Sequence, residues 1–98
     1  MKYRIVHLHG MPGVHKALIE ARWVKSGKQA LAALRAGYAA TDAREDGAMN
    51  AWRDDEGKYR VHSLRYLKTL EEKTFDTAKE AAAWVDRWMA RKRPEKAE

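Results

Sequence analysis

The sequence has no cysteine, and only two of its 98 residues are proline. The absence of cysteine excludes disulfide bonds, thiol catalysis and cysteine-ligated metal sites. No apolar run approaches the roughly 20 residues that a membrane-spanning helix needs. The basic start at Met1–His7 lacks the apolar segment of a signal peptide. We therefore expect a cytoplasmic protein with no membrane partner.

Length and charge suggest one folded domain, residues 1–98, with a basic surface. The chain is 45% hydrophobic and 35% charged, and its net charge is +6, which is typical of a folded, highly soluble protein. Residues 41–57 carry a net charge of −4, so the remainder carries +10. A basic balance of this kind favours a polyanionic partner.

Two segments of the chain resemble each other. Thr77 and Glu80 have the S/T-x-x-E spacing of a capping box, in which each side chain satisfies a backbone N–H of the first helical turn. Ser26 and Gln29 have the same spacing earlier in the chain, and the apolar Val24 stands where Phe75 stands in the later segment. We interpret the protein as two diverged copies of one strand–strand–helix unit.

The repeat divides the chain into copy one (2–37), an acidic connector (38–57), copy two (58–91) and a frayed tail (94–98). Strands are expected at 2–9, 14–24, 58–62 and 67–75, with a short extra strand at 48–53, and helices at 26–36 and 77–91. An alternative makes Ser63–Glu72 a helix, because leucines recur there at three-residue steps. The predicted fold is α+β, with a mainly antiparallel sheet of four or five strands and both helices on one face.

The apolar face of the last helix is expected to form the core. Trp84, Val85 and Trp88 follow the spacing of an amphipathic helix. We expect Trp84 and Phe75 to be mostly buried, and we place Trp23 in the core or at its edge, since aromatic residues at such spacings usually pack internally.

The second copy resembles a known DNA-binding domain. Gly57–Arg60, followed by Lys73–Ala81 with its F-x-T-x-x-E-A pattern, is similar to the amino-terminal arm-type DNA-binding domain of tyrosine integrases, which belong to phages and other mobile elements. The resemblance covers roughly Ala48–Met89. It implies a small three-stranded sheet followed by a helix, with the sheet entering the DNA major groove. No catalytic recombinase domain follows, and the first copy is an addition to the family's pattern.

The leading hypothesis is a small non-enzymatic module that binds nucleic acid, or a nucleoprotein complex, through a basic sheet face. The duplication is expected to place the first strands of the two copies side by side, so that their cations form one exposed stripe that neutralises phosphates. The candidate binding residues are Lys2, Arg4, Lys58, Arg60 and Arg65.

The alternative is a phage-type inhibitor or adaptor, similar to anti-CRISPR proteins, that binds a host protein. In that hypothesis the acidic connector makes the contacts, and Trp52 is the one tryptophan available to a partner. The candidate partner-binding residues are Trp52, Asp54, Asp55 and Glu56.

The sequence predicts no cofactor and no catalytic residue. His7, His9 and His15 invite a metal hypothesis, but no carboxylate lies near them and no H-E-x-x-H pattern is present, so we predict no metal site. The sequence leaves open whether the ligand is DNA or RNA, and whether the chain forms a homodimer.

Overall fold

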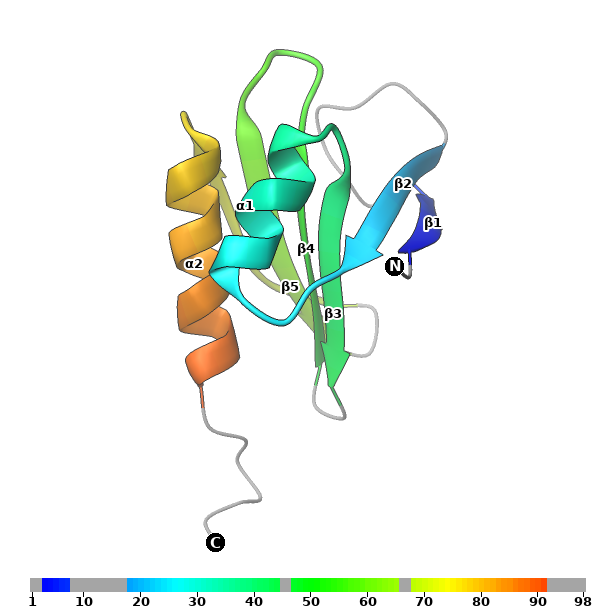
Figure 1. Cartoon of the computed structure of the whole chain (residues 1–98). Coiled ribbons are helices and arrows are strands. Elements are labelled where there is room, and N and C mark those ends of the chain that lie inside the picture. Colours follow the sequence, from blue (N-terminus) through cyan, green and yellow to red (C-terminus); the bar gives the residue numbers. More distant parts are fainter. Residues whose placement is uncertain (1–2, 8–17, 45–46, 66–67, 92–98) are drawn as a thin grey trace, which may run out of the picture.

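The computed structural model describes residues 3–7, 18–44, 47–65 and 68–91. Within these ranges the chain forms six strands and two helices (Figure 1). Their bounds in chain order are β1 Tyr3–His7, β2 Leu18–Trp23, α1 Gly27–Arg35, β3 Ala39–Arg44, β4 Gly47–Arg53, β5 Tyr59–Arg65, β6 Lys68–Phe75 and α2 Ala78–Ala90.

The strands form one sheet in which they follow one another in chain order, from β1 at one edge to β6 at the other. All neighbours are antiparallel except β2 and β3, which are parallel and joined through α1. Both helices lie on the same face of the sheet (Figure 1). The predicted α+β class is confirmed. The sheet has six strands, more than the four or five expected, because the connector supplies both β3 and β4.

The two segments interpreted as copies have the same order of elements, strand–strand–helix, but occupy different places in the sheet. The strands β5 and β6 confirm the strands predicted at 58–62 and 67–75, and the described residues of Ser63–Glu72 are in strands rather than in the alternative helix. In copy one the first strand, β1, is an edge strand, whereas in copy two the second strand, β6, is the edge. The expectation that the two first strands lie side by side is wrong. The strands β2, β3 and β4 lie between β1 and β5 in the sheet.

Both helices begin at the predicted caps. The Thr77 hydroxyl accepts a bond from Glu80 N (3.2 Å), and the Glu80 carboxylate accepts one from Thr77 N (3.2 Å), which completes the capping box. The Ser26 hydroxyl accepts from Gln29 N (3.1 Å), but the Gln29 side chain accepts from Lys25 N (2.7 Å), so this box is only half formed.

The core lies between the sheet and the two helices. Trp84, Val85 and Leu34 pack there against Met49 and Val61, all of them buried. Val24 is buried in this core as well, while Phe75 is partly buried against it. Trp23 is 37% exposed and does not belong to the core. It is the last residue of β2 and lies between Arg22, which stacks on Tyr38, and the buried Val24.

The other face of the sheet is also buried at its centre. Met49 and Ala51 of β4 pack toward the helices, so strand alternation places Asn50 and Trp52 on the helix-free side. Trp52 is 0% exposed, and His62, on the same side of β5, is 3% exposed. The helix-free side is therefore not an open plane, and its exposed part lies toward the edge strand β6.

Candidate nucleic-acid interface

The sheet register relates two of the predicted cations. Arg4 pairs with Ala21, and Ala21 with Ala39. The antiparallel register of β3 and β4 continues the row to Trp52, which pairs with Arg60. Arg4 and Arg60 thus occupy one row across the sheet. The three residues between them are each 0% exposed, so the row does not form the continuous exposed stripe that the sequence suggested. Lys2 lies outside the described residues.

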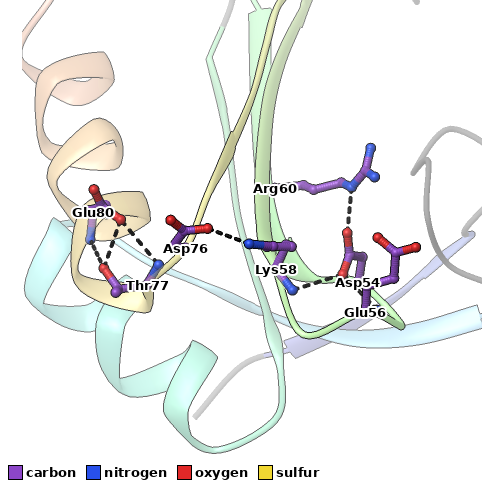
Figure 2. A network of polar contacts seen from close by, with 7 residues as sticks. All are labelled: Asp54, Glu56, Lys58, Arg60, Asp76, Thr77 and Glu80. Atoms are coloured by element: carbon purple, nitrogen blue, oxygen red, sulfur yellow. Dashed lines mark hydrogen bonds and ion pairs between the residues drawn. The ribbon is translucent and has the colours of Figure 1, made fainter.

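Arg60 is held by the acidic turn between β4 and β5. The Arg60 Nε donates to Asp54 Oδ2 at 2.7 Å, while Asp54 Oδ1 accepts from the backbone N–H groups of Glu56 and Lys58, each at 2.9 Å (Figure 2). The Asp54 side chain is 0% exposed and that of Arg60 is 23% exposed. Burial by itself raises the pKa of Asp54, but the hydrogen bonds from Arg60, Lys58 and Glu56 outweigh it and hold the pKa below its usual value. Asp54 is therefore an ionised carboxylate that orients Arg60.

Lys58 is paired at the surface. Its Nζ lies 2.5 Å from Asp76 Oδ1, next to the Thr77–Glu80 cap (Figure 2). The hydrogen bond raises the pKa of Lys58 and lowers that of Asp76. Both side chains are largely exposed, and exposed pairs of this kind contribute little to stability. Lys58 can exchange Asp76 for another anion at small cost.

Arg65 lies at the far end of β5 from this turn. It is directly opposite Lys68, the first residue of β6, and both are exposed. On β6, Glu71 pairs with Ser63 and accepts a bond from Arg91 at the end of α2 (2.9 Å). Sequence reasoning missed Lys68. The available signal was that Lys68 lies in the strand predicted at 67–75 and is close in sequence to Arg65.

Arg44 adds a further cation near the end of α2. Its guanidinium lies 4.5 Å from the centre of the Trp88 ring, and its Nη2 donates to the carbonyl oxygen of Met89 (2.7 Å). The Arg44 side chain is only 16% exposed. We therefore assign it to the packing of β3 against α2 rather than to the interface.

The surface predicted for the alternative hypothesis is only partly available. The prediction that Trp52 is open to a partner is wrong, because Trp52 is buried with its ring edge-to-face on His62 at 4.8 Å. The Asp54 carboxylate is already hydrogen-bonded to Arg60 and to the backbone of its own turn. Of the four candidate residues, only Asp55 and Glu56 are exposed.

A buried polar cluster lies beside Arg60 on the helix-free side. Asn50 Nδ2 and His62 Nε2 are 3.0 Å apart. Burial lowers the pKa of His62 to about 4, so the ring is neutral near pH 7 and its Nε2 can accept this bond. Asn50 Oδ1 and Trp52 Nε1 are buried without a hydrogen-bond partner. No pattern in the sequence indicated this cluster.

No protein-family model, curated protein or solved structure matches the chain. Within the described ranges, no three histidine or acidic side chains are grouped so that they could hold a metal ion. His9 and His15 lie outside those ranges. None of the described helices has the length and apolar character needed to cross a membrane.

Proposed function

We propose that the protein is a small non-enzymatic module that binds nucleic acid, or a nucleoprotein complex, through the hairpin of β5 and β6. The observation that carries the proposal is the placement of Arg65 directly opposite Lys68, both exposed, at the end of this hairpin. Two cations directly opposite each other on neighbouring strands can both contact one phosphate group, which lies within reach of their long side chains. Arg65, Lys68 and the exchangeable Lys58 are therefore the phosphate contacts of the proposal.

The arrangement around the hairpin supports the same function. β4, β5 and β6 form an antiparallel three-stranded unit, and α2 packs on one of its sides. This is the arrangement that the resemblance to integrase arm-type domains implies. It leaves the other side of β5 and β6 without a helix (Figure 1). A two-stranded ribbon fits the major groove of B-form DNA, which is about 12 Å wide.

The test is a fluorescence-anisotropy titration of the full chain against a labelled duplex DNA of about 20 base pairs, a single strand of the same length and the matching duplex RNA. Each is measured at about 50 and 200 mM salt, the range over which phosphate contacts lose affinity steeply. We expect duplex DNA to bind at low salt and to weaken at high salt. If none of the three nucleic acids binds at low salt, the proposal is wrong.

A further inference from the structure

The contact between Asp54 and Arg60 determines which part of the arginine is available to a ligand. The bond to Asp54 occupies Nε, and in Figure 2 the two terminal nitrogens of Arg60 point away from Asp54. Because the acceptor is a buried carboxylate within a hydrogen-bonded turn, the guanidinium is fixed on the sheet. A fixed guanidinium presents two parallel N–H donors to a planar pair of acceptors.

The neighbours of Arg60 on the same side of the hairpin are one polar uncharged residue and one acidic residue. Thr74 lies directly opposite Arg60, and Glu72 lies opposite His62, so both share the helix-free side. Both are exposed. The strip formed by Arg60, Thr74 and Glu72 thus has a carboxylate at one end. A carboxylate repels phosphate, so this strip is poorly suited to contact the nucleic-acid backbone.

We propose that the strip formed by Arg60, Thr74 and Glu72 reads base edges in the major groove, with Arg60 contacting a guanine. Guanine offers O6 and N7 as a planar acceptor pair, and arginine bound to both atoms is the commonest base-specific contact in protein–DNA complexes. Glu72 accepts from the N4 amino group of cytosine, which is the base contact suited to a carboxylate. The inference rests on the proposed function, to which it adds sequence specificity.

In this scheme Asp54 is a positioning residue. It touches no base, but it fixes the plane of Arg60, so that fewer rotamers are lost when the guanine contact forms. A phosphate contact depends mainly on positive charge, which a lysine in place of the arginine also supplies. A guanine contact depends on the two fixed N–H donors, which lysine lacks. Replacing Arg60 with lysine therefore separates the two kinds of contact.

The experiment begins with selection from a pool of random-sequence duplex DNA by the full chain at about physiological salt. The enriched duplex is then made with guanine and with 7-deazaguanine, which lacks the N7 acceptor. We expect a guanine-containing consensus and an affinity loss of about tenfold or more on 7-deazaguanine substitution. Arg60→Lys and Asp54→Asn should each reduce this difference between the two duplexes, and Glu72→Gln should relax the preference for cytosine.

Lys79→Ala, an exposed site on α2, is the matched control and should leave the guanine preference unchanged. Thermal melting of Asp54→Asn verifies that it is folded at the assay temperature. If that variant is unfolded, the Arg60→Lys variant alone tests the inference. Salt-dependent binding without any enriched sequence, or an Arg60→Lys variant with an unchanged guanine preference, overturns the inference but leaves the proposed function standing. Absence of any binding at low salt overturns both.

Discussion

The backbone N–H of Gly27, the first residue of α1, donates a hydrogen bond of 2.6 Å to the carboxylate of Asp86 in α2. The two residues are 59 positions apart, and this bond fixes the approach of the two helices. A Cβ atom at position 27 would lie only 2.5 Å from the carbonyl oxygen of Ala82. Glycine is therefore required here by close packing of the helices.

Gly27→Ala should lower the free energy of unfolding by about 1–3 kcal/mol, because the added methyl group overpacks a rigid contact with α2. Urea denaturation followed by circular dichroism measures the change. Lys28→Ala, at the next and exposed position, is the control and should change stability by no more than about 0.5 kcal/mol. A Gly27→Ala variant as stable as the wild type would show that the two helices are not in close contact.

Trp84→Ala should be the most damaging single truncation of the core. The side chain is 1% exposed, and its Nε1 donates to Glu71 (3.2 Å), so we expect a loss of about 3–5 kcal/mol. Phe75→Ala should cost clearly less, since Phe75 is only partly buried. Chemical denaturation of both variants measures the two losses in the free energy of unfolding. Equal losses for the two variants would contradict the packing described for α2.

Stability should fall between about pH 6.5 and pH 4 because of His62. Burial lowers its pKa in the folded protein to about 4, whereas an unfolded histidine titrates near 6.5. In this window the unfolded chain binds the additional proton, so unfolding becomes more favourable as the pH falls. The shift corresponds to at most about 3.5 kcal/mol.

His62→Gln is the control for this prediction. It removes the titratable ring and should therefore remove the dependence that His62 causes between pH 6.5 and 4, which thermal melts across this range measure. Below this window, protonation of Asp54 and Glu71, whose pKa values are lowered in the fold, removes further stability in both proteins. A wild-type melting temperature that stays constant from pH 6.5 to 4 would contradict the burial of His62.

Much of the local structure could be predicted because its signals are short-range. The Thr77–Glu80 box is encoded within four residues, and it marks the start of α2 without knowledge of the rest of the fold. The strand β3 was missed because Ala39–Arg44 contains three alanines and an aspartate, which are poor strand formers. Its conformation is imposed by pairing with β2 and β4.

The candidate site was predictable only in part. Sequence reasoning selected Arg60 and Arg65, but it assigned Asp54 to the protein-binding surface of the alternative hypothesis. The contact between Asp54 and Arg60 depends on the turn that returns the chain after β4. The burial of Trp52 likewise depends on packing between distant segments. No periodic pattern around Trp52 predicts this burial from the sequence alone.

The most direct test of the central claim is the salt dependence of duplex DNA binding by the variant with both Arg65→Ala and Lys68→Ala. Each phosphate contact contributes about 0.9 to the slope of log K against log salt. The double variant should therefore bind more weakly, with a slope reduced by nearly two. The control variant, with Lys28→Ala and Lys79→Ala, carries the same change in net charge at exposed helix positions and should keep the wild-type slope. Equal slopes for the wild type and the hairpin variant would contradict the proposal that the β5–β6 hairpin binds nucleic acid.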